Sequence, residues 1–272
     1  MITRITRDTI NELTIQPRIV AMPNYKSFFY TFHTAEPIEI GRLQDDYIES
    51  TECIKGGYLL LKSYAIQQSP ISSYLTCVKR LVDLYLHLLQ AVKMLNEASI
   101  IHLNICFQNI IIKDGNLPLL TGLESATFFL MSPLKTIRSP IECRALRYII
   151  GNKLASISSY TIIDICGDNK EEQTFLSKYI NQPATNIIVS LLKYASTWNV
   201  YSLNEMILSL LHNPIQPDTF LFKWKNLLER GIIAAADDRG TADYFIEQTK
   251  ELMYSADIAE LTIATTSSSA LL

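Results

Sequence analysis

The sequence predicts an α+β protein in which a small, mainly β N-terminal region precedes a larger and predominantly α-helical region. Residues 1–56 carry short apolar clusters separated by prolines, which is typical of short strands and loops. Residues 73–98 instead carry apolar side chains at intervals of three and four, the spacing of a long amphipathic helix. Helical patterns return later in the chain, at 200–211, 219–229 and 241–254.

The composition is that of a folded globular protein. The chain has 272 residues, of which 48% are hydrophobic and 19% are charged, so it can bury a substantial core. A formal net charge of −3 gives no global electrostatic reason to expect binding to nucleic acid or to an anionic membrane. No apolar run approaches the ~20 residues that a membrane span needs. We therefore expect a soluble, intracellular protein that binds neither nucleic acid nor membrane.

The five cysteines give no sign of a disulfide framework or a metal site. They are widely spread, without a CxxC pair and without a histidine at metal-ligand spacing, so reduced thiols and no metal are expected. Cys106 could be a reactive thiol, although a small buried hydrophobe is the favoured interpretation. The cysteines are Cys53, Cys77, Cys106, Cys143 and Cys166.

The centre of the chain predicts a strand, a helix and a hairpin in succession. Residues 58–64 form a compact apolar run after two glycines, as in a buried strand. After the helix at 73–98, two apolar runs at 109–112 and 117–120 flank an Asp-Gly turn, which predicts a β-hairpin. Pro118 is compatible with this hairpin if its strand lies at the edge of the sheet.

The loop before the hairpin resembles the catalytic loop of protein kinases. Kinases carry His-Arg-Asp followed by a metal-binding Asn, and the spacing is kept here with Asn104 in place of the Asp and Asn109 in place of the Asn. The loop reads His102-Leu103-Asn104-Ile105-Cys106-Phe107-Gln108-Asn109. Further matches follow in the order found in kinases, and together they are much more specific than any one of them.

These further matches lie on the expected elements. Thr121-Gly122-Leu123, or Leu120-Thr121-Gly122 with a loop one residue shorter, stands where kinases have Asp-Phe-Gly. Ser139-Pro140-Ile141-Glu142 resembles the Ala-Pro-Glu segment, and Thr197-Trp198-Asn199-Val200-Tyr201-Ser202-Leu203 resembles the start of the central C-lobe helix. Asp237-Asp238-Arg239 is similar to the segment whose Arg pairs with the Glu of Ala-Pro-Glu.

The resemblance covers residues 57–255 and implies a protein kinase-like fold. It implies a reduced N-lobe-like region at 1–64, a helical C-lobe-like domain at 65–258 and a flexible tail at 259–272. It also implies a buried pair between Glu142 and Arg239, and hydrogen bonds from Asn199 to the loop backbone. The sequence of these segments is most similar to kinase-like proteins of large DNA viruses. We therefore expect a cytoplasmic protein or, if it is viral, one of the host-cell cytoplasm or the virion.

The groups that kinases use for chemistry are substituted. Asn104 cannot accept the proton of a substrate hydroxyl at neutral pH, and loss of a general base costs ~10²–10⁴ in rate. Thr121 offers one neutral hydroxyl where Mg²⁺ prefers an anionic oxygen. No Gly-x-Gly-x-x-Gly and no recognisable ATP-binding Lys occurs. The resemblance therefore implies a protein without catalysis, cofactor or bound metal, and it argues against binding of ATP and Mg²⁺.

Other interpretations remain open for the same residues. His102 could be a hydrogen-bonded core or loop histidine, and Asn104 and Asn109 could be ordinary turn residues or could retain some metal binding. The leading hypothesis is a pseudokinase that acts as a scaffold or competitor through a protein partner. The alternatives are a structural virion or assembly protein, and an atypical active kinase that uses another acid such as Asp114 or Glu124.

Overall fold

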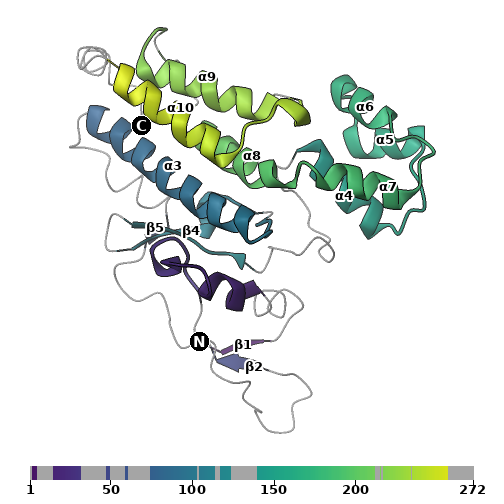
Figure 1. The fold of residues 1–272 in the computed structure, drawn as a ribbon, viewed down its shortest axis with the longest axis horizontal. Helices are drawn as coiled ribbons and strands as arrows, with labels where there is room; N and C mark the ends of the chain where they lie inside the picture. The colour runs from purple at the N-terminus through teal and green to yellow at the C-terminus, as the bar shows by residue number, and fades with distance from the viewer. Residues whose placement is uncertain are drawn as a thin grey trace.

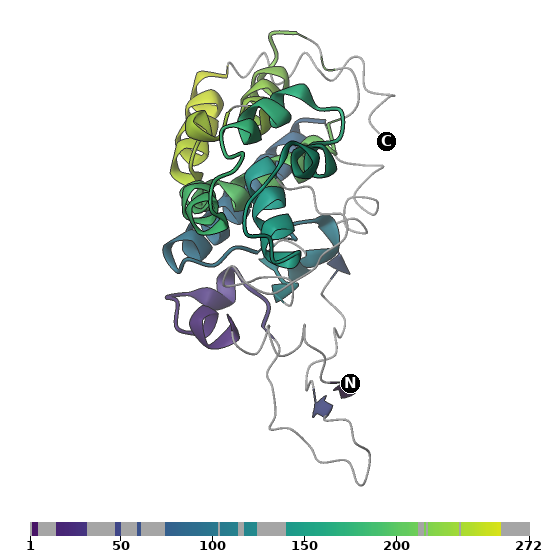
Figure 2. The same ribbon diagram turned by 90° about the vertical axis from the view of Figure 1, so that its right-hand side faces the viewer.

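The computed structural model is an α+β fold in which helices predominate, as the sequence predicts (Figures 1 and 2). The helices fall into two groups that lie side by side. In the view of Figure 1, the strands β4 (Ile110–Lys113) and β5 (Leu117–Leu120) lie below the group of longer helices, which contains α3 (Tyr74–Glu97). No helix in the described part of the chain is both long and apolar enough to cross a membrane. The structure describes residues 2–4, 15–31, 47–49, 59–60, 74–102, 104–113, 117–123, 140–211, 215, 217–233 and 235–256.

The predicted hairpin is confirmed and forms the centre of a small antiparallel sheet. β4 (Ile110–Lys113) pairs with β5 (Leu117–Leu120), and β3 (Leu59–Leu60) pairs with the other side of β4. Of the strand predicted at 58–64, only these two residues lie within the described part. Pro118 stands opposite Ile112 on β5, the outer strand of the order β3-β4-β5, where its missing N–H is tolerated.

The N-terminal region adds three small pieces of structure. β1 (Ile2–Arg4) and β2 (Tyr47–Glu49) form an antiparallel pair. Residues 15–20 are helical and are followed by the short 3-10 turn η1 (Tyr25–Ser27). The backbone then meets the free edge of β5, because Leu120 donates to the carbonyl of Phe28 at 2.8 Å and accepts from Tyr30 at 3.0 Å. The sheet is therefore extended by the N-terminal segment at Leu120.

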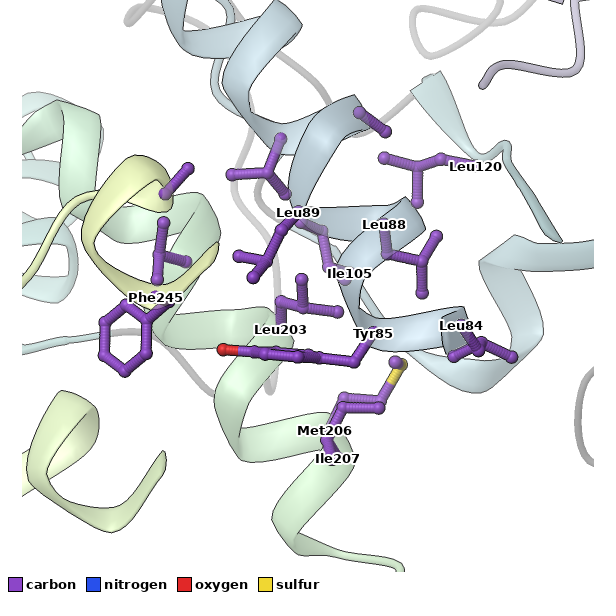
Figure 3. Packing of buried hydrophobic residues seen from close by; sticks show 14 of the residues in the cluster. Leu84, Tyr85, Leu88, Leu89, Ile105, Leu120, Leu203, Met206, Ile207 and Phe245 are labelled. Atoms are coloured by element: carbon purple, nitrogen blue, oxygen red, sulfur yellow. The ribbon is translucent and has the colours of Figure 1, made fainter. Parts of the chain in front are cut away.

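Four long helices surround the larger hydrophobic core. α3 (Tyr74–Glu97) packs against α8 (Ala195–Leu208) and α10 (Ala242–Ser255), and α9 (Phe220–Ile233) packs against α8 and α10. Figure 3 shows Tyr85, Leu88 and Leu89 of α3 directed toward Leu203, Met206 and Ile207 of α8. We call the buried cluster that these residues belong to the main core. These helices confirm the four helical patterns seen in the sequence, except that α8 begins at Ala195 rather than near residue 200.

A second group of helices was not predicted. It comprises α4 (Ile141–Gly151), α5 (Ser159–Cys166), α6 (Lys170–Ser177) and α7 (Ala184–Leu192). These helices bury their own cluster, the side core, whose members are Ile101, Ile141, Cys143, Ala145, Leu146, Ile149, Ile157, Ile162, Cys166, Leu176, Tyr179, Ile187, Leu191 and Trp198. Two of these short helices begin at side-chain caps: for α5, Ser158 forms a capping box with Thr161, and for α6 the Asn169 side chain accepts from the Glu172 N–H.

The two cores meet at the start of α8 and at the loop before the hairpin. On α8, Trp198 belongs to the side core, whereas Val200 belongs to the main core. In the loop, Ile101 belongs to the side core, whereas Ile100 and Ile105 belong to the main core. The residues singled out in the sequence at 102–109 therefore lie at the junction of the two groups of helices.

Candidate functional site

The backbone at the start of the loop is held by one side chain of α8. Asn199 is 1% exposed, and its Oδ1 accepts from the backbone N–H of His102 at 2.9 Å. Its Nδ2 donates to the carbonyl oxygen of Ile100 at 3.0 Å and to Oδ1 of Asn96 at 3.0 Å. Because the amide uses both an acceptor and its donors, Asn199 fixes the loop backbone with no charge.

The ring of His102 joins the loop to the end of the hairpin. Its Nε2 lies 2.8 Å from the carbonyl oxygen of Thr121, and its Nδ1 lies 3.3 Å from the backbone nitrogen of Asn104. A backbone N–H can only donate, so Nδ1 accepts and Nε2 carries the proton that is donated to Thr121. Complete burial lowers the pKa of His102 to about 4, so the ring is neutral at neutral pH.

The far end of the loop is closed by Asn109. Its Nδ2 donates to the carbonyl oxygen of Asn104 at 2.8 Å, and its own carbonyl accepts from the backbone N–H of Thr121 at 2.9 Å. Gly122 lies directly against this side chain: it has φ of +79°, and a Cβ placed there would lie 2.3 Å from Cγ of Asn109. Glycine is therefore required both by the backbone conformation and by the space.

Asn104 is the residue that the sequence resemblance aligns with the Asp of a kinase catalytic loop. The side chain is partly buried, and its Oδ1 lies 3.5 Å from Sγ of Cys106, the distance of a weak thiol hydrogen bond. Thr121 is buried, with 8% exposure, immediately after β5. No group of three or more His, Cys, Asp or Glu side chains that could hold a metal ion occurs within the described ranges.

Glu142 and Arg239 form a buried ion pair. The carboxylate in the first turn of α4 accepts two hydrogen bonds of 3.2 Å from Nη1 and Nη2 of Arg239, and the two side chains are 1% and 4% exposed. Nη1 also lies 3.4 Å from Oγ1 of Thr197, and the guanidinium lies 5.3 Å from the ring centre of Tyr201. The pair therefore joins α4 and the segment before α10 to the first half of α8.

The neighbouring Asp237 takes part in the same contact region rather than in a metal cluster. The hydroxyl of Tyr194, at the start of α8, donates to its Oδ1 at 3.0 Å. Burial, together with this hydrogen bond, raises the pKa of Tyr194 to about 12. Asp238 is exposed on the adjoining 3-10 turn.

The predicted residues thus form two arrangements. His102, Asn104, Asn109, Thr121 and Asn199 share one continuous network of hydrogen bonds, which we call the loop network. Glu142 and Arg239 form a separate ion pair. Leu103, Asp114, Glu124 and Ser139 lie outside the described residues, so the alternative acids stay untested.

Two contributors were missed by sequence reasoning. Asn96 accepts from Asn199 at 3.0 Å and donates to the carbonyl oxygen of Ser196 at 2.7 Å, and Thr197 supports Arg239. In the sequence, Asn96 is simply a polar residue near the end of a predicted helix. Polar residues are common there, so its position did not mark it as part of the site. Their partners lie far away along the chain, so no local pattern marks either residue.

The cysteines whose side chains the structure describes form no disulfide. Cys143 and Cys166 are buried, and Cys106 is partly exposed. Burial raises the pKa of Cys166 to about 11, which keeps it in the unreactive thiol form. The side chains of Cys53 and Cys77 lie outside the described residues.

No model of a protein family matches the chain, and no curated protein matches it. The resemblance to protein kinases therefore rests on the residues of this sequence alone.

Proposed function

We propose that this chain is a catalytically inactive protein with a kinase-like C-terminal lobe, and that it acts by binding another protein as a scaffold or competitor. The observation that carries the proposal is the loop network. It holds the backbone of residues 102–109 from both sides through side chains that are all uncharged at neutral pH. Such a loop keeps its shape without offering an acid for phosphoryl transfer.

The substitutions at the two acid positions support inactivity. In phosphoryl transfer one acid accepts the substrate proton and another holds the metal that bridges the phosphates. An amide at Asn104 cannot accept that proton, and its oxygen already faces the thiol of Cys106. At Thr121 the carbonyl accepts from His102, and the side chain can contribute at most one neutral hydroxyl.

The buried ion pair between Glu142 and Arg239 supports the proposal that the chain acts through its shape. Burying Glu142 and Arg239 is costly unless both remain, because removing one partner leaves an uncompensated charge in the interior. A chain that has this pair but not the two acids has the support for a shape without the groups of a reaction centre. Binding of a protein partner is the activity that such a shape can still support.

The proposal is tested by a thermal-shift titration of the purified full chain with ATP and Mg²⁺ or Mn²⁺. A ligand that binds only the native state adds about 2.7 kcal/mol at 100 times its dissociation constant, so binding would raise the melting temperature by several degrees. We expect no shift at millimolar nucleotide.

Phosphate transfer from labelled ATP provides the second arm of the test. We expect no transfer by the wild-type chain or by variants Asn104→Ala and Glu171→Ala, where Glu171 is an exposed residue of α6. Transfer that is lost in Asn104→Ala but kept in Glu171→Ala would overturn the proposal in favour of an atypical active kinase.

A further inference from the structure

A groove of about 270 Å³ lies between the end of α9, the 3-10 turn η4 (Ala236–Asp238) and the first turns of α10. Figure 1 shows α9 and α10 side by side, with the segment that joins them at one end of the pair. The groove belongs to neither the loop network nor the ion pair. It has no part in the proposed function as described above.

The floor of the groove is apolar because two glycines let the backbone approach aromatic rings. A Cβ on Gly231 would lie 2.4 Å from Cζ of Phe245, and one on Gly240 would lie 2.3 Å from Cδ1 of Tyr244. Phe245 is itself buried, with 1% exposure. Any side chain at these two glycines would displace the rings that line the groove.

The rim exposes apolar surface that the main core does not use. Ile233 is 76% exposed and Tyr244 is 43% exposed, and both line the groove. Single exposed apolar residues are ordinary on protein surfaces, but these two share one groove, so a single ligand can cover both. Ile233 and Tyr244 can therefore gain the most from being covered by a ligand.

Two charges on the groove are free to pair with a ligand. Arg230 and Asp238 are exposed, and neither makes an ion pair or a side-chain hydrogen bond to any residue in the described part of the chain. Nearby charges on the same helices are already paired, as in Lys225 with Glu229 and Lys93 with Asp243. A ligand of this groove is thus expected to carry an acid for Arg230.

We propose that this groove binds a short segment of a partner protein that carries one bulky apolar side chain beside an acidic residue. The apolar side chain covers Ile233 and Tyr244, the acid pairs with Arg230, and Asp238 accepts from an N–H or a basic side chain of the segment. The groove is open to the surface, whereas sites for small molecules bury most of the ligand, which favours a peptide laid across it. The inference rests on the proposed function only in that the protein acts by binding.

The test begins with selection of random displayed peptides on the intact chain. Selected sequences are then synthesised with a fluorescent label and measured by anisotropy against the wild type, Ile233→Ser, Arg230→Glu and the control Val189→Ser. Val189 is a matched exposed β-branched residue, 62% exposed on α7. Because Ile233 is exposed, Ile233→Ser should fold, and its melting temperature verifies this.

We expect the selected peptides to share a bulky apolar residue next to Asp or Glu. Loss of one apolar contact of this size should weaken binding at least ~10-fold in Ile233→Ser and leave Val189→Ser unchanged. Arg230→Glu should weaken binding of the acidic peptides and favour versions in which the acid is replaced by Lys. This reversal distinguishes a specific charge contact from general stickiness of the surface.

Three results would overturn the inference. One is that no selected peptide depends on Ile233. Another is equal binding by the wild type and Arg230→Glu. The third is a dimer in analytical ultracentrifugation that dissociates in Ile233→Ser, since a second copy would then occupy the groove.

Peptide binding by a chain that also transfers phosphate would refute only the proposed function. A chain inert toward ATP that shows no groove-dependent peptide would refute only this inference.

Discussion

The loop network and the Glu142–Arg239 pair bury polar groups beside the same stretch of α8, yet they do so in opposite ways. Asn199 holds the loop with neutral hydrogen bonds, whereas Thr197, two residues earlier, supports a fully charged pair. Both arrangements join segments far apart in sequence. Among the described residues, buried charge therefore occurs where it has a matched partner, whereas the loop network is built from groups that are neutral at neutral pH.

The largest effect is expected from unbalancing the charged arrangement. Arg239→Met leaves the carboxylate of Glu142 buried without its partner, so the free energy of unfolding should fall by about 3–5 kcal/mol. The double variant Glu142→Leu/Arg239→Met removes both charges and should recover most of the loss. Urea denaturation of the two single variants and the double variant measures this. Simple addition of the single losses would contradict a coupled pair.

The neutral arrangement should instead be sensitive to pH through His102. Burial lowers its pKa to about 4, below the ordinary value of 6.5, so the unfolded chain binds more protons between these values. Stability is therefore lost as pH falls through this window, by up to about 3 kcal/mol. His102→Gln, whose amide can still donate to Thr121, should have a flatter profile. Parallel slopes for the two proteins between pH 6.5 and 4 would contradict the prediction.

Placing a charge in the neutral arrangement should also destabilise it. In Asn199→Asp a carboxylate would face the carbonyl oxygen of Ile100 and Oδ1 of Asn96, which now accept from the amide at 3.0 Å each. We expect a loss of about 2–3 kcal/mol. Asn186→Asp is the matched control, because Asn186 is exposed in the first turn of α7, where an acid is tolerated. Equal denaturation midpoints for the two variants would be inconsistent with this account.

The smallest effect is expected where the loop faces outward. Asn104→Asp introduces an acid at a partly exposed position, so stability should change by less than about 1 kcal/mol. Under the proposed function we expect no phosphate transfer by this variant, since Thr121 would still offer no anionic oxygen to a metal. Labelled ATP with Mg²⁺ or Mn²⁺ measures this, and transfer by Asn104→Asp would show that one substitution alone had silenced the site.

The parts of the fold that could be predicted are those with long repeating patterns. α3 extends over 24 residues with regular apolar spacing, and the hairpin has two apolar runs about an Asp-Gly turn. The helices α5 and α6 have only 8 residues each, too few for the helical period to stand out. Their caps at Ser158 and Asn169 were local signals that could have located them.

The site could be predicted in its members but not in its partners. The family resemblance selected His102, Asn109 and Asn199 by their spacing. It could not indicate that Asn96 completes the amide chain, because that contact spans 103 residues and depends on the tertiary fold. The start of α8 was missed for a related reason: Asn199 is buried at a position where periodicity expects an apolar side chain.

Because α8 contributes side chains to both cores, it links the unfolding of the two groups of helices. Its first half buries Trp198 in the side core, and its second half buries Leu203 and Ile207 in the main core. Melting of the helix would therefore remove support from both cores at once. The two groups of helices are expected to lose their structure together as one cooperative unit, even though each has its own apolar interior.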